Sequence, residues 1–138
     1  MNATASLKRP LPQPRNFSQP FWDAAKQRKL VAQYDPEARK FQFFPRPVSV
    51  YTGKRNLEWR ELSGKGTVYT YTVTRRGPPA FHGQEPYVIA TVELDEGIRI
   101  MANLVRVDPE RVEIGMKVRV AWEDLDDKFT FFVFEPDR

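Results

Sequence analysis

The chain has 138 residues, of which 41% are hydrophobic and 29% charged, and this composition excludes a wholly disordered chain and predicts one real core. It contains no cysteine, which excludes disulfides, thiolate metal sites and cysteine nucleophiles. No apolar run approaches the roughly 20 residues of a membrane helix, and the N-terminus lacks an apolar signal-peptide core, so we expect a cytoplasmic protein without membrane contact.

The net charge of +4 is distributed unevenly. Residues 1–65 hold 13 Lys/Arg and 5 Asp/Glu, a net charge of +8, whereas residues 66–138 hold 9 and 13, a net charge of −4. A basic N-terminal half would attract anionic partners such as nucleic acid, a phosphorylated cofactor or an acidic protein surface. A solvated basic face explains the same pattern equally well, and both readings stay open.

The N-terminal part predicts a flexible arm followed by one helix. Residues 1–17 are rich in proline and offer no apolar face, which is typical of an extended or disordered segment. Ser18 can cap a helix over Gln19 to Lys29, because proline is tolerated in the first helical turn. Apolar residues at helical spacing give this helix its buried face: Phe21, Trp22 and Ala25.

A small hairpin and a third strand follow the helix. Leu30 to Gln33 and Lys40 to Phe44 are its predicted strands, and Asp35 to Ala38 forms the turn. A second turn, Ser49 to Asn56, leads into a third strand, Leu57 to Leu62, in which apolar and charged residues alternate.

The remaining chain reads as all-β. Asp95 to Gly97 forms a tight hairpin turn, and Asp108 to Val112 has the capping residue and proline of a short helical turn. The five predicted strands are 67–74, 87–94, 98–104, 118–123 and 129–134. A helical turn between the third and fourth of five strands favours an OB-fold over an SH3-like barrel or a small sandwich. The last strand is apolar on both faces, so one face should meet the barrel and the other a further element or partner.

Five segments resemble a bacterial and archaeal family that has a rubredoxin-like zinc ribbon followed by an OB-fold, often called acyl-CoA-associated (domain of unknown function thirty-five). They are FFPRP at Phe43–Pro47, LEW at Leu57–Trp59, GKGTVYTYTV at Gly64–Val73, PYVIATVELDEGIRIMANLV at Pro86–Val105 and DPERVEIGMKVRV at Asp108–Val120. The resemblance runs in order from about Phe21 to Phe134. It implies a mainly β chain in three parts: a flexible arm (1–17), a helix with a degenerate zinc-ribbon-like subdomain (18–62) and a five-stranded OB-fold barrel (63–138).

The family ribbon holds zinc through two C-x2-C pairs, and the corresponding positions here are Asp35, Ala38, Ser49 and Thr52. Only Asp35 is a plausible zinc ligand, so we expect a metal-free ribbon without bound zinc. Something else must then stabilise it, and an aromatic and apolar core is the expected substitute, with Phe44 inside it. The candidates are Tyr34, Phe41, Phe43, Phe44, Val48, Val50 and Tyr51.

Catalysis is not expected. His82, the only histidine, lies in a Pro/Gly-rich loop without a partner at a motif spacing, and it reads as an exposed loop residue. No phosphate-binding or nucleophile-elbow motif is present.

The resemblance instead implies a non-catalytic accessory protein that binds CoA or acyl-CoA, docks a thiolase-like enzyme of lipid, steroid or polyketide metabolism, or does both. Basic residues would receive the CoA phosphates, and an aromatic ring would pack the adenine or pantetheine. The candidate ligand-binding residues are Phe43, Arg46, Lys54, Arg55, Arg75 and Arg76. The alternative is a single-stranded nucleic-acid-binding OB-fold, which the negative charge of the barrel half disfavours. A homodimer or a purely structural subunit also stays open.

Overall fold

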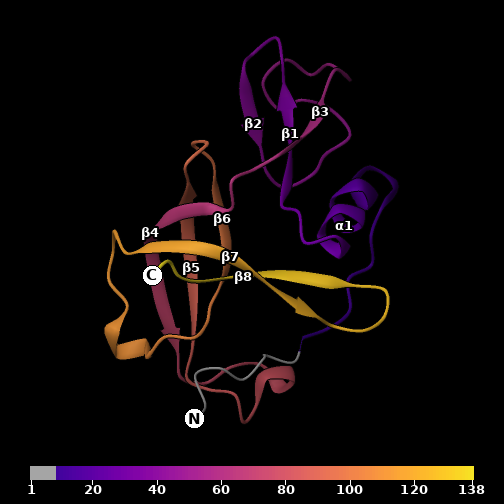
Figure 1. The fold of residues 1–138 in the computed structure, drawn as a ribbon. Coiled ribbons are helices and arrows are strands. Elements are labelled where there is room, and N and C mark those ends of the chain that lie inside the picture. The colour runs from indigo at the N-terminus through magenta and orange to yellow at the C-terminus, as the bar shows by residue number, and fades with distance from the viewer. Residues whose placement is uncertain (1–8) are drawn as a thin grey trace.

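A small three-stranded sheet stands at one end of a five-stranded barrel, and the helix α1 lies beside both (Figure 1). The structure is a computed structural model that describes residues 9–138. Within this range, no helix combines the length and apolarity needed to cross a membrane. The mainly β architecture predicted from the strand-forming runs is confirmed.

The helix α1 spans Gln19–Lys26 and is shorter than predicted. Arg28 takes a left-handed backbone with φ of 60°, and the N–H of Lys29 turns back to the carbonyl of Ala24 at 3.0 Å. This C-terminal turn satisfies the last carbonyls and ends the helix three residues before the predicted end. The helix buries Phe21 and Ala25, as their spacing predicts.

Ser18 is the N-cap residue of α1, as predicted, but its side chain does not cap the helix. Ser18 closes a 3-10 turn, Asn16–Ser18, and its hydroxyl bonds to the backbone N–H and carbonyl of Arg15, both at 3.0 Å. It makes no side-chain bond to the helical N–H groups of α1. The start of α1 is therefore set by the preceding turn and by Pro20, whose fixed φ suits the first helical positions.

Arg9 attaches the N-terminal segment to the barrel. The Arg9 guanidinium lies 2.9 Å from a carboxylate oxygen of Glu123, 2.9 Å from the side-chain oxygen of Asn103 and 4.7 Å from the ring centre of Phe131. A flexible arm is expected over residues 1–17, and its residues 1–8 lie outside the part of the chain that the structure describes.

The three-stranded sheet has the order β2-β1-β3, and all its pairs are antiparallel. Its strands are β1 (Val31–Asp35), β2 (Lys40–Gln42) and β3 (Glu58–Glu61). The hairpin and third strand expected after the helix are therefore confirmed.

The second sheet is a closed barrel of five strands in the order β4-β5-β6-β8-β7. A 3-10 turn, Pro109–Arg111, lies between β6 and β7, and the Asp108 side chain caps it by accepting the N–H of Glu110 at 3.0 Å. The OB-fold is thus confirmed. The barrel strands are β4 (Lys65–Thr74), β5 (Tyr87–Leu94), β6 (Arg99–Leu104), β7 (Lys117–Asp124) and β8 (Thr130–Pro136).

Barrel closure depends on a close approach at Gly66. This residue pairs with Leu94 of β5 and Val118 of β7, so β4 joins both neighbours at one point. A Cβ at Gly66 would lie 2.3 Å from the carbonyl oxygen of Glu93, which leaves room only for glycine.

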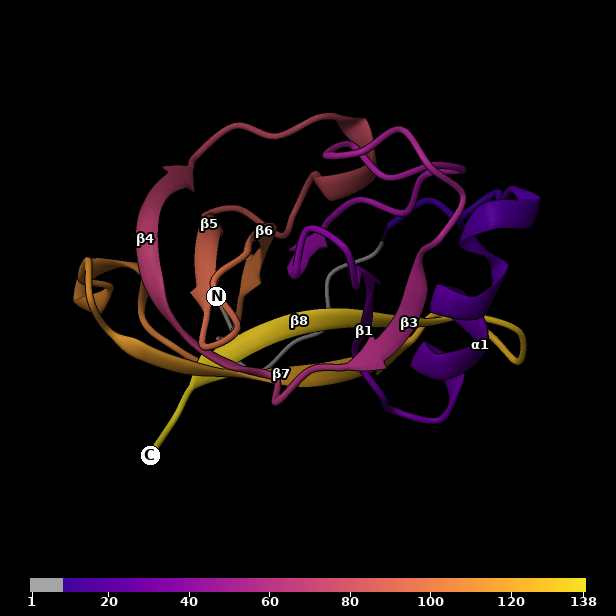
Figure 2. The ribbon, with the colours of Figure 1, turned by 90° about the horizontal axis from the view of Figure 1, so that it is seen from above.

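One apolar core continues from the helix through the small sheet into the barrel. Seen from above, β8 runs beneath β1 and β3 towards α1 (Figure 2), and α1 contacts both β1 and β8. Phe21 packs its ring 5.8 Å from Phe132 of β8, and Trp22 packs 5.8 Å from Phe131. On the second face of the last strand, Phe131 is therefore covered by Trp22 of the chain's own helix and by Arg9, so this residue does not require a partner to cover it.

Candidate functional site

The loop between β2 and β3, residues 43–56 (the ribbon loop), is held in place by two buried glutamines of the small sheet. Gln33 and Gln42 are each 4% exposed, and their side chains bond to each other at 2.9 Å. Gln33 also donates to the carbonyl of Arg46 and accepts its N–H, both at 2.8 Å. Gln42 accepts the N–H of Val50 at 2.9 Å. Satisfied buried amides of this kind give an irregular loop one defined conformation.

A second network is centred on Asp35, at the end of β1, where the side chain is fully buried. The Ser49 hydroxyl makes a short hydrogen bond to one carboxylate oxygen, and the Thr52 hydroxyl donates to the same oxygen at 2.9 Å. The side-chain amide of Asn56 donates to the other oxygen at 3.0 Å. We call this arrangement the Asp35 hub. It ties the β1–β2 turn to the second half of the ribbon loop.

Two backbone groups complete the Asp35 hub. The N–H groups of Glu37 and Ala38 donate to the carboxylate at 2.9 and 3.1 Å, as in a local Asx turn. The hydrogen bond from Ser49 is the main reason that the pKa of the Asp35 carboxyl lies far below its usual range, although burial acts in the opposite direction. Asp35 is therefore a buried anion stabilised by donors rather than by an ion pair.

The Asp35 hub does not have the donor set of a zinc site. The four positions that the family resemblance assigns to zinc ligands do meet here, but Ser49 and Thr52 point their hydroxyl hydrogens at the carboxylate, and Ala38 contributes a backbone N–H. Zinc requires lone pairs of sulfur, nitrogen or oxygen aimed at the ion. The amide oxygen of Asn56 is buried without a partner, but its amide nitrogen is the side that faces Asp35. Among residues 9–138, no three His, Cys, Asp or Glu side chains are grouped to hold a metal.

The surface of the ribbon loop exposes large apolar side chains. Phe44 is 59% exposed, Val50 51% and Tyr51 45%. The predictions that Phe44, Val50 and Tyr51 belong to a core are therefore wrong. Phe43 is packed instead, with its ring 5.7 Å from that of Phe21 in the helix. Part of the expected compensating core is present, since Tyr34 and Phe41 pack with ring centres 4.8 Å apart.

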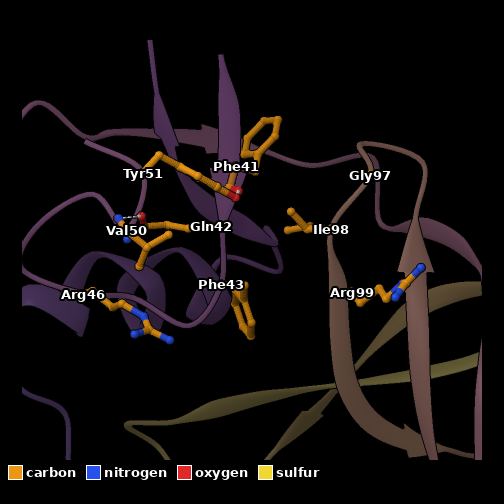
Figure 3. A pocket seen from close by; sticks show the side chains of 9 residues that line it. All are labelled: Phe41, Gln42, Phe43, Arg46, Val50, Tyr51, Gly97, Ile98 and Arg99. Atoms are coloured by element: carbon orange, nitrogen blue, oxygen red, sulfur yellow. Dashed lines mark hydrogen bonds between the residues drawn. The ribbon is translucent and has the colours of Figure 1, made fainter. Parts of the chain in front are cut away.

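Two shallow grooves border this loop. The first, the ribbon–barrel groove, lies between the loop and the β5–β6 turn (Figure 3). Its residues are Phe41, Gln42, Phe43, Arg46, Val50, Tyr51, Gly97, Ile98 and Arg99. The second, the helix–ribbon groove, is lined by Asn16, Phe17, Pro20, Gln33, Arg46, Pro47, Arg55, Leu57 and Trp59. Arg46 lines both grooves, which makes it the centre of this surface.

The structure brings together three of the six predicted ligand-binding residues. Phe43 and Arg46 share the ribbon–barrel groove, and Arg46 and Arg55 share the helix–ribbon groove. Neither arginine forms an ion pair with any residue in the 9–138 range, so both charges are available to a ligand.

The other three residues lie elsewhere. Lys54 is committed to Glu37 at 2.7 Å, and this contact raises its pKa. Arg75 and Arg76 follow β4, in a loop at the end of the barrel opposite the small sheet (Figure 1), and Arg75 pairs with Glu110 at 3.0 Å.

His82 is exposed, and its Nε2 lies 3.1 Å from the carbonyl of Gly77. No serine or carboxylate hydrogen bond to its ring is present among the residues that the structure describes. The geometry matches the loop residue that the sequence indicated.

Sequence reasoning missed the polar residues that build the site. The sequence patterns do not distinguish Gln33, Gln42 and Asn56 from other polar residues, and they indicate Ser49 and Thr52 only as poor metal ligands. One signal was present in the sequence. Of the four positions aligned with the family's zinc ligands, one is the aspartate Asp35 and two are the hydroxyl residues Ser49 and Thr52, which can donate hydrogen bonds to a carboxylate.

Comparisons with known proteins agree with the fold. The family model of the ChsH2 C-terminal OB-fold domain matches residues 59–123. A chain of the Ltp2-ChsH2(DUF35) aldolase has a similar structure, with a TM-score of 0.81 and 38% identity over 91% of this chain and 98% of that one. A DUF35 protein of unknown function from Sulfolobus solfataricus shares the fold at 13% identity, with a TM-score of 0.63 and coverage of 88% and 86%.

Curated relatives carry two kinds of name. A probable enoyl-CoA hydratase alpha subunit from Thermomonospora curvata is 41% identical over 88% of this chain and 38% of its own length. A DUF35 domain-containing scaffold protein from Methanocaldococcus jannaschii is 45% identical over 62% of this chain and 64% of its own length. Each match thus spans less than two thirds of the relative.

Proposed function

The chain belongs to the DUF35 family, and from this membership we propose that it is a non-catalytic accessory protein that docks a thiolase-like enzyme of acyl-CoA metabolism. The relatives support an accessory role, since they are named as scaffold proteins, as hydratase alpha subunits and as one component of an aldolase. The cytoplasm remains the expected compartment.

The observation that carries the proposal is the exposed apolar surface of the ribbon loop. Phe44, Val50 and Tyr51 are between 45% and 59% exposed, although Gln42 accepts the backbone N–H of Val50 and Ser49 accepts that of Tyr51. A rigid loop loses little conformational entropy on binding, and exposed aromatic side chains are typical of interface centres. We infer that this loop is the docking surface.

CoA binding is the second part of the proposal. The helix–ribbon groove combines Arg46 and Arg55, which form no ion pair within residues 9–138, with the partly buried rings of Phe17 and Trp59. Guanidinium groups bind phosphate oxygens, and an aromatic wall suits adenine or pantetheine. This groove is the best candidate site for the phosphate-bearing part of CoA.

The docking test is co-expression with a thiolase-like enzyme from the same source, followed by affinity capture and size-exclusion chromatography. Phe44→Ser and Val50→Ser should each weaken the complex by about tenfold or more, because they remove apolar contacts from the interface centre. Both residues are exposed, so the thermal unfolding of the free chain should change little.

A matched control exists on the barrel. Ile114 is 69% exposed and lies in the segment before β7, so Ile114→Ser removes a comparable apolar surface outside the ribbon loop. Equal loss of binding in this control, or no complex with any such enzyme, would contradict the proposal. Calorimetry with CoA and acyl-CoA tests the ligand part separately.

A further inference from the structure

The Asp35 hub is arranged like the knuckle of a metal site, but its central group is an anion instead of a cation. In a metal site a cation lies at the centre and electron pairs converge on it. Here a carboxylate lies at the centre, and five N–H or O–H groups from the β1–β2 turn and the ribbon loop converge on it. The nearby Lys54 ammonium donates to Glu37 instead of Asp35.

We propose that the Asp35 carboxylate replaces a structural metal ion in this ribbon, holding the turn 35–38 against the turn 49–56 and keeping the ribbon loop folded without metal. Such a replacement requires a different residue at every ligand position of the knuckle, because an anion needs hydrogen-bond donors where a cation needs lone pairs. Alanine at position 38 fits this requirement, since that position supplies only its backbone N–H.

The Asp35 hub reaches the proposed docking surface through Ser49. While its hydroxyl donates to Asp35, the same oxygen accepts the N–H groups of Tyr51 and Thr52 at 3.1 and 3.2 Å. The hydrogen bond to Ser49 thereby holds the backbone of the exposed Tyr51. The inference itself rests on the hydrogen bonds alone and stands whether or not the chain docks an enzyme.

Metal analysis is the first test. Chain purified in buffer containing zinc sulfate should carry no stoichiometric zinc, and a chelator should leave its thermal unfolding unchanged. One zinc per chain, or a lower melting temperature with the chelator, would overturn the proposal.

Asp35→Asn is the second test, because an amide keeps the shape but places N–H donors opposite the existing donors. The melting temperature should fall by about 5 °C or more, and amide exchange in residues 36–56 should accelerate by about tenfold or more. Glu37→Gln, an exposed charge two residues away, is the matched control and should change neither quantity appreciably. If Asp35→Asn does not fold, Thr52→Val, which deletes a single donor, should give a smaller shift of the same kind. Unchanged exchange in both variants contradicts the proposal.

Restoration of a metal site is the third test. The combined variant Asp35→Cys, Ala38→Cys, Ser49→Cys and Thr52→Cys should bind one zinc per chain and melt at a higher temperature with zinc than without. A folded variant that does not bind zinc would show that the Asp35 hub does not occupy the place of a metal.

Discussion

Buried charges in this protein are compensated in two different ways at the level of single residues. Asp35 is surrounded by neutral donors, whereas Glu123 is paired with Arg9 at 2.9 Å, with side chains only 4% and 8% exposed. Loss of either set of partners leaves a buried carboxylate without compensating donors or charge, which is costly. Both residues therefore give clear tests.

The first prediction concerns acid stability. The pKa of Asp35 is lowered in the folded chain, chiefly by Ser49, so the unfolded chain binds a proton at Asp35 more readily than the folded chain does. The stability contributed by Asp35 is fully present above the unfolded pKa of about 4 and is lost as the pH falls from there towards the folded pKa.

Asp35→Asn removes this titration. The difference in melting temperature between the original chain and the variant should therefore narrow as the pH is lowered from about 5 towards 2. The exposed Lys54–Glu37 pair beside the hub is common to both chains and cancels in the comparison. A difference that stays constant over this range, measured by circular dichroism, would contradict the prediction.

The second prediction concerns Arg9. Arg9→Met should lower the free energy of unfolding by about 3 kcal/mol, because it leaves the buried Glu123 without its cation. Arg28→Met is the control, since it breaks an ion pair with Asp124 whose side chains are 53% and 57% exposed. Urea denaturation measures the free energy of unfolding of both variants. An equal loss of stability in the two variants would contradict the prediction.

At the level of elements, the small sheet serves as a support for a loop. The strands β1 and β2 place Gln33, Asp35 and Gln42 on the side that the ribbon loop covers, and all three side chains are buried. The loop then carries Arg46 between two grooves and exposes its apolar side chains. Short strands that anchor a rigid loop are a common way to position a binding surface.

The third prediction belongs to this loop. Arg46→Ala and Arg55→Ala should each weaken CoA binding by about tenfold, because each removes a charge-assisted contact to phosphate. Arg75→Ala and Arg76→Ala should have little effect, since these residues follow β4 at the other end of the barrel. If calorimetry shows a larger loss of CoA affinity for the Arg75 and Arg76 variants than for the Arg46 and Arg55 variants, the binding site lies in the loop between β4 and β5 instead.

At the level of the whole molecule, the charge asymmetry follows the architecture. The basic half contains the helix and the ribbon loop, and the acidic half forms nearly the whole barrel. The exposed Tyr69 and Tyr71 of β4 could stack bases, but Arg99, which lies 3.7 Å from the ring centre of Tyr69, is also paired with Glu93. This arrangement favours an accessory role over nucleic-acid binding.

The fourth prediction tests that choice. Fluorescence anisotropy with a labelled single-stranded oligonucleotide should show no binding that weakens steeply with salt, because such binding uses a basic groove and residues 66–138 carry a net charge of −4. Tight, salt-sensitive binding would favour the nucleic-acid alternative. Sedimentation of the free chain addresses the open question of a homodimer.

The sequence by itself determined the order and kind of the elements. The alternation in β4 to β8, the turn at Gly97 and the capped turn at Asp108 are local signals, and local backbone preferences were enough to predict the OB-fold. The absence of cysteine likewise predicted a ribbon unlike a thiolate site.

Only the tertiary structure decided which side chains meet. Phe43 and Phe44 are adjacent and chemically identical, but Phe43 packs against Phe21 of α1 and Phe132 of β8, whereas Phe44 is exposed. In the same way, Asp35 and its donors Ser49, Thr52 and Asn56 are separated by 14 to 21 positions, and only the pairing of β1 with its neighbours brings them together. Contacts between distant residues depend on how the elements pack, and a pattern of neighbouring residues does not contain that information.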